Sequence, residues 1–453
     1  MTRVRIETLG CRLNTAEMET LATTLTSWGH RVVTPDETAD LCIFNTCTVT
    51  AMASRKSRQA LRKLRRSNPD AVIVATGCYA EMEPDAVSAL GIDLVVGNED
   101  KDRLVEILNE RGLLRDDGPE ELLSLRTGPD PHRRTRAFLK VQDGCDNTCA
   151  YCIVTIARGP GRSQPPSAVI DNITQLLDAG FKEIILSGVH LGSYGHDRGD
   201  RNGLQNLIKR LLNLGTIPRL RLSSIEPWDL SPAFFDLFTD PHLMPHIHLP
   251  LQSGCDATLK RMARRTTQRE YSNLVAQARQ RLPNISISTD VMVGFPGETE
   301  AEFDQSIAFV RSMNFSHLHI FRFSMREGTP AAMMDHQVSG SIATQRSRQF
   351  HQLNATLEQS FAEHFRDREA YVLWESADDL GTKLRWSGLT PHAIRIVTET
   401  PLEADLFNQI TRTRILSRVP GGVHGQVDGI SLTPAIEEQA GRLVTIDGSH
   451  IKS

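Results

Sequence analysis

The stretch QDGCDNTCAYC, residues 142–152, carries three cysteines, Cys145, Cys149 and Cys152, on one short loop. Three thiolates this close together can hold three corners of a metal centre, and a four-coordinate centre then needs one more ligand. A structural zinc site would have a fourth Cys or His nearby, but the next cysteine is Cys255. The spacing favours an iron–sulfur cubane whose open iron binds the amine and carboxylate of a small molecule. Structural zinc and incidental thiols are the alternatives.

The triplet lies at the start of a segment in which strand-like and helix-like runs alternate. Helix-like periodicity is visible, for example, at 167–180 and 271–282. Six β/α units in succession predict a partial (β/α)6 barrel, whose chemistry lies at the carboxyl ends of its strands. The six strand-like runs are 137–144, 183–192, 219–227, 246–254, 285–297 and 317–325.

The N-terminal part of the chain shows the same alternation on a smaller scale. It predicts a parallel sheet with helices on its faces, and so an α/β domain. Asn14 and Glu17 predict a capping box for the first helix, and Gly29 predicts its C-terminal end. The strand-like runs here are 4–10, 41–47, 71–78 and 93–100.

Three of these N-terminal strands end in a cysteine, namely Cys11, Cys47 and Cys78. Because the carboxyl ends of neighbouring parallel strands lie side by side, we expect the three thiols to converge and to hold a second open-site cluster. Buried thiols packed as small hydrophobic groups are the alternative. Cys42 and Cys255 have no partners in the pattern, so for them we favour the packed thiol.

After a last helix at 346–367, five short β-type runs between 369 and 430 predict a small β-barrel. Glycines, prolines and charges interrupt the pattern between the first two parts and indicate a linker. The expected division is an N-terminal domain at 1–115, a linker at 116–133, a barrel core at 134–363, a β-barrel module at 364–433 and a tail at 434–453.

The composition is that of a folded chain, with 40% hydrophobic and 23% charged residues among 453. We find neither a signal peptide nor an apolar run long enough for a bilayer, so we expect a cytoplasmic protein without a membrane partner. Eight cysteines in a reducing compartment favour metal ligands or catalytic thiols over disulfides. With a net charge of −4, nucleic-acid binding would depend on local basic patches.

The strongest such patch is a helix-like run directly after Cys47. It suits phosphate contacts with RNA, whose affinity would fall with salt, although a solvated amphipathic face is the alternative. Its cations are Arg55, Lys56, Arg58, Arg62, Lys63, Arg65 and Arg66. The runs HRRTR at 132–136 and TRTRILSR at 411–418 are weaker patches.

The 145–152 triplet on a partial barrel resembles the radical S-adenosylmethionine superfamily. The resemblance implies that the methionine part of the cofactor chelates the open iron. TDVMVGFPGET, from Thr289 to Thr299, is similar to a glycine-rich motif that meets the adenine, which points to Gly294 and Gly297. LSGVHLG at 186–192 is at the position that meets the cofactor's amino group, which points to Gly188. Tight strand-to-helix turns are the alternative explanation of these glycines.

The order of the three parts, over nearly the whole chain, resembles the methylthiotransferases, whose last part is an RNA-binding TRAM module. LGCRLNTAEME at 9–19 and the run at 45–66 are more similar to the branch acting on N6-threonylcarbamoyladenosine at position 37 of tRNA. The isopentenyladenosine branch has a glutamine-methionine pair and the ribosomal-protein branch a proline-lysine pair where this chain has Arg12-Leu13.

This resemblance implies methylthiolation of C2 of that nucleoside with two 4Fe-4S clusters and S-adenosyl-L-methionine. The partners would be a tRNA anticodon loop and an electron donor and a sulfur source of unknown identity. The chain departs from the family at Thr155 and Ile156, which would line the substrate entrance. Competing functions are methylthiolation of isopentenyladenosine-37 or of a ribosomal-protein side chain, and a noncatalytic iron–sulfur module that binds RNA.

Overall fold

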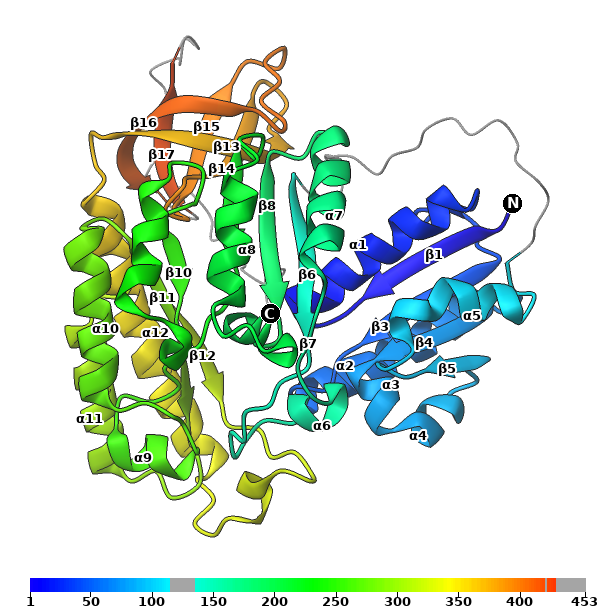
Figure 1. The fold of residues 1–453 in the computed structure, drawn as a ribbon, viewed down its shortest axis with the longest axis horizontal. Coiled ribbons are helices and arrows are strands. Elements are labelled where there is room, and N and C mark those ends of the chain that lie inside the picture. The colour runs from blue at the N-terminus through cyan, green and yellow to red at the C-terminus, as the bar shows by residue number, and fades with distance from the viewer. Residues whose placement is uncertain (115–134, 420–421, 429–453) are drawn as a thin grey trace.

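The computed structural model describes residues 1–114, 135–419 and 422–428. Its elements form a smaller N-terminal sheet, a larger barrel-like core and a C-terminal β-barrel at one end of the core (Figure 1). The expected linker at 116–133, the tail at 434–453 and residues 132–134 of the weaker HRRTR patch lie outside the described residues. Within the described ranges, no helix combines the length and apolar character needed to cross a bilayer.

The N-terminal domain is a five-stranded parallel sheet with the strand order β2-β1-β3-β4-β5. Helices cover both faces, and each face buries its own apolar core. The α/β prediction is therefore confirmed, and β1, β3 and β4 are neighbours. The strands are β1 (Arg3–Thr8), β2 (Arg31–Val32), β3 (Leu41–Thr46), β4 (Val72–Gly77) and β5 (Leu94–Val96). The helices are α1 (Arg12–Ser27), α2 (Ala51–Ser67), α3 (Cys78–Met82), α4 (Pro84–Ser88), η1 (Lys101–Arg103) and α5 (Leu104–Glu110).

Helix α1 corrects one prediction. It begins at Arg12 with Cys11 as its N-cap, so Asn14 and Glu17 lie inside the helix and the capping box is wrong. Both side chains are buried, because this face of α1 packs against the barrel core and makes polar contacts there. Gly29 has φ +83°, a left-handed conformation that suits glycine, and directly follows the C-cap as predicted.

The core contains the six predicted strands as an open (β/α)6 arrangement in two sheets, β7-β6-β8-β9 and β10-β11-β12. Two isolated parallel bridges, Leu220 to Leu243 and Ser224 to His248, connect the sheets between β9 and β10. The strands are β6 (Arg136–Asp143), β7 (Arg162–Ser163), β8 (Glu183–Gly188), β9 (Arg219–Leu222), β10 (His246–His248), β11 (Ser286–Val293) and β12 (His317–Arg322).

Helices cover the outside of this open barrel (Figure 1). On the inner side of β6, Ala16 of α1 packs with Phe138 and Ile185, so the N-terminal domain abuts the barrel at β6 and β8. The helices are α6 (Val154–Arg158), α7 (Pro166–Asp178), α8 (Gly203–Leu212), α9 (Asp256–Arg261), α10 (Gln268–Arg281), α11 (Glu300–Ser312) and α12 (Gly340–Glu363). Short 3-10 turns are η2 (Leu191–Ser193), η3 (His196–Arg198), η4 (Pro227–Asp229), η5 (Pro232–Thr239) and η6 (Pro330–Met333).

The C-terminal part is a closed barrel in the order β13-β14-β15-β17-β16, as predicted. Trp374 and Trp386 lie in its core. Its β14–β15 connection contacts the amino end of the core, where Arg219 donates to the Leu389 carbonyl (3.1 Å) and Arg221 to that of Pro391 (3.1 Å). The strands are β13 (Glu369–Asp379), β14 (Leu384–Leu389), β15 (Arg395–Thr400), β16 (Ile410–Val419) and β17 (Gly422–Val427).

Candidate metal centres at the domain junction

The N-terminal cysteines follow three adjacent strands of the sheet. Cys11 comes after β1, Cys47 after β3, and Cys78 begins α3 directly after β4. Gly10 has φ +118°, and a Cβ there would lie 2.8 Å from the Cys47 Sγ, so the loop of Cys11 passes directly over Cys47. Burial raises the pKa of Cys47, and together with the charges of Cys11 and Cys78 it brings that pKa to about 12. The structure thus brings this triplet together.

The second triplet lies on the loop between β6 and α6. Gly144 has φ +71°, and a Cβ there would lie 1.9 Å from the Pro160 carbonyl oxygen, so only glycine fits the turn that enters this loop. The Cys145 amide donates to the Gly159 carbonyl (3.0 Å), and the Ala150 amide donates to that of Met262 (2.9 Å). These bonds fix both ends of the loop against the core.

Polar groups of the core surround this second triplet. The Asn147 amide lies 3.4 Å from the Cys145 Sγ, and Arg264 Nη1 lies 3.7 Å from the Cys149 Sγ. Arg264 is itself held by a bidentate ion pair with Glu226 (3.0 and 2.6 Å). N–H groups directed at sulfur stabilise thiolates and tune the clusters that they bind.

His190 is the other polar neighbour of this loop. Burial would lower its pKa, but its hydrogen bonds to Asp229, with an Nε2 to Oδ2 distance of 2.5 Å, and to Cys145 raise that pKa to about 10. The imidazole is therefore positively charged at neutral pH. A positive charge beside Cys145 complements the negative charge of a thiolate that binds a cluster.

The donor chemistry of both triplets fits iron–sulfur clusters. All eight cysteines are free thiols. Burial raises the pKa of Cys149 and raises that of Cys152 to about 11, so coordination is what would deprotonate these thiols. In the described parts of the chain, no three Cys, His, Asp or Glu side chains meet around a single ion. A cubane does not need such convergence, because its thiolates bind different iron atoms.

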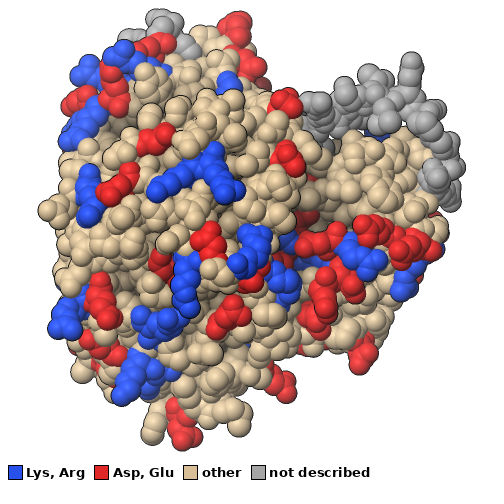
Figure 2. Space-filling model, viewed as in Figure 1, with Lys and Arg blue, Asp and Glu red and all other residues tan. Residues whose placement is uncertain are grey.

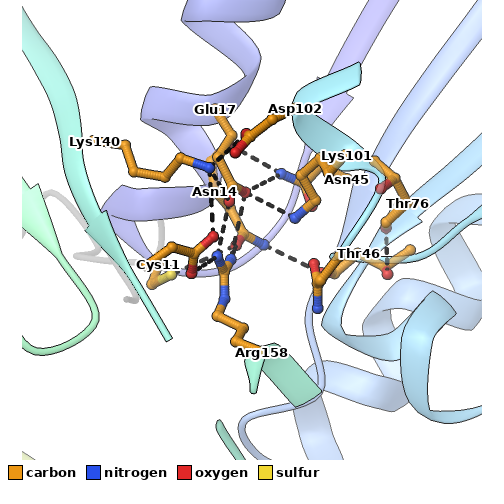
Figure 3. Close-up of polar contacts among 12 residues, drawn as sticks. Cys11, Asn14, Glu17, Asn45, Thr46, Thr76, Lys101, Asp102, Lys140 and Arg158 are labelled. Atoms are coloured by element: carbon orange, nitrogen blue, oxygen red, sulfur yellow. Dashed lines mark hydrogen bonds and ion pairs between the residues drawn. The ribbon is translucent and has the colours of Figure 1, made fainter. Parts of the chain in front are cut away.

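A buried set of polar side chains lies beside Cys11, where the N-terminal domain meets β6 and α6, and we call it the junction cluster (Figure 3). It consists of Asn14, Glu17, Asn45, Lys101, Lys140, Asp143 and Arg158. The first four belong to the N-terminal domain, and the last three belong to β6 and α6 of the core. The cluster therefore joins the strand ends that carry the first triplet to the strand and helix that flank the second.

Glu17 is the centre of the junction cluster, and only 2% of its side chain is exposed. Its carboxylate lies 2.9 Å from Lys101 Nζ, 2.7 Å from Arg158 Nη1 and 3.6 Å from Lys140 Nζ. Burial would raise the pKa of Glu17, but these three cations hold it well below its usual value. Arg158 also pairs with Asp143 at 2.8 Å. Removing one member of such a buried pair is destabilising by about 3–5 kcal/mol.

The three glycines predicted to approach the cofactor all lie at strand ends of the core. Gly188 ends β8, where a Cβ would lie 2.9 Å from the Gln142 Oε1. Gly294 and Gly297 follow β11 with φ +76° and φ +75°. The nearest neighbours that an added Cβ would meet at these two positions are Ala343 of α12 and Arg261 of α9, so turn geometry and packing already require glycine. Contact of these glycines with a cofactor stays a prediction.

The predicted basic helix is α2, whose buried side consists of Ser54, Ser57, Leu61 and Leu64. Two of its seven cations have structural partners, because Arg65 pairs with Asp93 and Arg58 donates to the Tyr79 hydroxyl (3.3 Å). The other five, Arg55, Lys56, Arg62, Lys63 and Arg66, are exposed.

Charge on the face shown in Figure 2 is mixed. On the face in Figure 2, acidic side chains gather over the lobe of α4, β5 and α5, and basic ones are interspersed elsewhere. This face therefore shows no uniform positive patch, and RNA binding by α2 stays a prediction that depends on its local charge.

Thr155 and Ile156, the positions where the chain departs from the family pattern, face different ways. Thr155 Oγ1 donates to the Asn147 carbonyl (3.2 Å) and braces the cysteine loop, whereas Ile156 is 50% exposed. The Ile156 Cδ1 lies 3.5 Å from where a Gly328 Cβ would be, beside the loop that follows β12. Cys42 and Cys255 are both buried, and Cys42 packs in the apolar core of the sheet.

Sequence reasoning missed the junction cluster and the two cations beside the second triplet. Arg158 lies six positions after Cys152 in the segment IVTIARG, and that short spacing was the available signal. His190 lies within the LSGVHLG motif, in which the sequence analysis assigned a role only to Gly188. Lys101 and Arg264 have no local signal, because folding alone brings them to the triplets.

Comparisons with known proteins agree with this architecture. Residues 3–97 match the family model Uncharacterized protein family UPF0004, and residues 139–310 match the Radical SAM superfamily. The chain is 34% identical to the threonylcarbamoyladenosine tRNA methylthiotransferase MtaB of Bacillus subtilis, over 92% of this chain and 94% of that protein. It is 33% identical to the tRNA-2-methylthio-N(6)-dimethylallyladenosine synthase of Staphylococcus aureus, over 75% of this chain and 69% of that protein.

The fold also resembles solved structures. The radical S-adenosylmethionine methyltransferase TsrM of Kitasatospora setae, with cobalamin and a [4Fe-4S] cluster bound, aligns with a TM-score of 0.54 at 16% identity. The alignment covers 74% of this chain and 77% of that one. At this identity the likeness supports the fold alone.

Proposed function

Since the chain belongs to the radical S-adenosylmethionine tRNA methylthiotransferases of the threonylcarbamoyladenosine type, we propose that it inserts a methylthio group at C2 of N6-threonylcarbamoyladenosine-37. The reaction would take place on the anticodon loop of tRNA in the cytoplasm. The observation that carries this proposal is the pair of cysteine triplets, each at the carboxyl ends of parallel strands, on the two sides of one junction.

The triplets would divide the work between them. When bound, a 4Fe-4S cluster at Cys145, Cys149 and Cys152 supplies the electron that cleaves S-adenosylmethionine, and a second at Cys11, Cys47 and Cys78 carries the sulfur. The chain's own task is to hold six thiolates and to keep water away from the reacting C2 atom. Burial of Cys47, Cys78 and Cys145 supports this task.

The substrate would enter beside the loops that meet at the junction. The loop after β12 contacts the loop of Cys47, where Ser324 Oγ accepts from the Ala51 amide at 3.0 Å and Arg326 donates to Thr48. Helix α2 starts at this contact, so its exposed cations suit phosphates next to the entering nucleoside. The C-terminal barrel, as a TRAM-type module, would hold a more distant part of the tRNA.

The division of work can be tested with single cysteine variants of the full chain. Anaerobically reconstituted wild type, Cys47→Ala and Cys149→Ala would be incubated with dithionite, S-adenosylmethionine and tRNA carrying threonylcarbamoyladenosine. Mass spectrometry of the nucleosides and quantification of 5′-deoxyadenosine give two independent readouts. Cys42→Ala is the matched control, because Cys42 packs in the core of the same sheet.

We expect Cys47→Ala to form 5′-deoxyadenosine but no methylthio nucleoside, and Cys149→Ala to form neither. Cys42→Ala should retain both products. Formation of the methylthio nucleoside by Cys47→Ala would refute the role of the first triplet. Absence of 5′-deoxyadenosine with wild type would refute the radical chemistry and favour a noncatalytic module.

A further inference from the structure

Arg158 belongs to the core, yet its side chain is directed at the N-terminal triplet (Figure 3). Its Nη2 donates to the Asn14 Oδ1 at 2.8 Å, and that oxygen lies 3.6 Å from the Cys11 Sγ. Its charge also interacts with those of Cys47 and Cys78. Only 2% of the side chain is exposed, so water screens these interactions little.

The buried charges of the junction cluster do not balance. Its cations are Lys101, Lys140 and Arg158, and its buried carboxylates are Glu17 and Asp143, so three positive charges oppose two negative ones. Lys140 also contacts Asp102 at 2.7 Å, but Asp102 is 72% exposed and its charge is largely solvated. Burial lowers the pKa of Lys101, and its ion pair with Glu17 at 2.9 Å opposes that shift. With Lys101 protonated, one excess positive charge is buried beside the N-terminal triplet.

A cubane bound by three thiolates carries net negative charge, and each added electron makes that charge more negative. Buried positive charge nearby stabilises the reduced form, and net charge is one of the factors that set the reduction potential of an iron–sulfur cluster. The guanidinium also orders Asn14, whose amide nitrogen donates to the carbonyls of Leu9 (2.8 Å) and Thr46 (3.1 Å). The Leu9 carbonyl lies two positions before Cys11 in the sequence, and the Thr46 carbonyl lies directly before Cys47.

We propose that Arg158 is a positioning residue that the core contributes to the N-terminal triplet, and that its charge raises the reduction potential of the cluster held there. The inference rests on the proposed function, because it requires Cys11, Cys47 and Cys78 to hold a cluster. It also makes the N-terminal domain depend on the core, because the reduction potential of the N-terminal cluster would be raised by Arg158, a side chain of the core.

The test isolates the N-terminal site in the full chain. A Cys145→Ala/Cys149→Ala/Cys152→Ala background leaves one cluster, whose midpoint potential is measured by a redox titration followed by electron paramagnetic resonance. Three further changes are compared in this background. Arg158→Met removes one positive charge, Glu17→Gln removes one negative charge, and Arg158→Lys keeps the charge and loses the planar fork.

With Arg158→Met, the ratio of reduced to oxidised cluster at a fixed potential should fall at least about tenfold, which is 59 mV for one electron. Glu17→Gln should shift this ratio in the opposite direction, and Arg158→Lys should change it by less than about threefold. Equal potentials in the background, Arg158→Met and Glu17→Gln proteins would overturn the proposal. Shifts of Arg158→Met and Glu17→Gln in the same direction would also overturn it, because they would indicate disturbed structure and not charge.

Two controls keep these outcomes distinct. If Arg158→Met alone fails to fold, judged by far-ultraviolet circular dichroism, Arg158→Met/Asp143→Asn removes one charge of each sign. The double variant should then recover most of the background potential, and a potential as low as the charge loss predicts would overturn the proposal. If the background protein itself takes up no iron, the proposed N-terminal cluster site is what fails.

Discussion

At the scale of single residues, Asn14 links two cysteine loops of the N-terminal sheet to Arg158 of the core through its side-chain hydrogen bonds. Its amide nitrogen donates to the Leu9 and Thr46 carbonyls, and its oxygen accepts from Arg158. A carboxamide suits this position because it donates and accepts at once. A carboxylate would repel the two carbonyls. An apolar side chain would take this donor away from both carbonyls and would leave Arg158 with Glu17 and Asp143 alone.

Asn14→Ala should therefore lower the free energy of unfolding by about 1–3 kcal/mol, the cost of leaving buried polar groups unpaired. Urea unfolding of the metal-free protein, followed by circular dichroism, measures this change. Asn109→Ala is the matched control, because Asn109 is an exposed residue of α5. Equal losses in the two variants would contradict the structural role of Asn14.

Residues such as Asn14 show where sequence reasoning stops. Asn14 and Glu17 have the spacing of a capping box, and that local pattern gave the wrong answer because both side chains face another domain. The cysteines could be assigned from spacing and from the strands that they follow. The ion pairs of Glu17 with Lys101 and Arg158 could not be predicted, because these two partners lie 84 and 141 positions after Glu17 in the sequence.

At the scale of elements, α2 is a helix with two chemically different sides. The Thr50 side chain accepts from the Ala53 amide (3.1 Å) and caps its start, and small or apolar residues bury its inner side. The outer side carries exposed cations, among them the adjacent pair Arg62 and Lys63. Helix α8 offers a matched pair in Lys209 and Arg210, which are exposed on the outside of the core.

If α2 binds phosphates, Arg62→Gln/Lys63→Gln should make tRNA affinity less dependent on salt. Each lost phosphate contact lowers the slope of log K against log salt by about 0.7–0.9, so the pair should lower it by about 1.4–1.8. Filter binding between 50 and 200 mM salt, the range over which such contacts change affinity strongly, gives the slope. The same substitutions at Lys209 and Arg210 should leave the slope unchanged, and similar slopes for both pairs would argue for a merely solvated α2.

Strands and helices were largely predictable because each has a strong local period. Six of the seven core strands and the five strands of the C-terminal barrel match the predicted runs. The two-residue strands β2 and β7 were missed, since two residues show no alternation. How the N-terminal domain sits on β6 was not predictable, because that contact joins helix α1 to a strand more than a hundred positions away.

At the scale of the whole molecule, buried charges also join the core to the C-terminal barrel. Glu183 is completely buried and pairs with Arg219 (2.7 Å) and Arg221 (2.8 Å), and both arginines donate to carbonyls of the β14–β15 connection. Burial would raise the pKa of Glu183, but Arg221, Arg219 and Arg136 lower it to about 2. The carboxylate thus stabilises the folded chain above its ordinary pKa of 4.5, and this contribution is lost as the pH falls through about 2.

Glu183→Gln should therefore destabilise the protein at pH 7 by about 3–5 kcal/mol, because it leaves buried arginines unpaired. The difference from wild type should narrow below pH 4.5. Urea unfolding midpoints of the two metal-free proteins, taken at several pH values, measure this difference in stability. Glu363→Gln at the exposed end of α12 is the control, and a difference that does not change with pH would show that the carboxylate charge is not responsible.

The identity of the modified nucleoside can be measured in a single competition experiment. Reconstituted wild-type protein would receive equal amounts of two tRNAs with the same anticodon stem-loop, one carrying N6-threonylcarbamoyladenosine and the other N6-isopentenyladenosine at position 37. Nucleosides from both would be quantified by mass spectrometry. We expect the methylthio derivative of threonylcarbamoyladenosine alone. Conversion of isopentenyladenosine, with threonylcarbamoyladenosine left untouched, would contradict it.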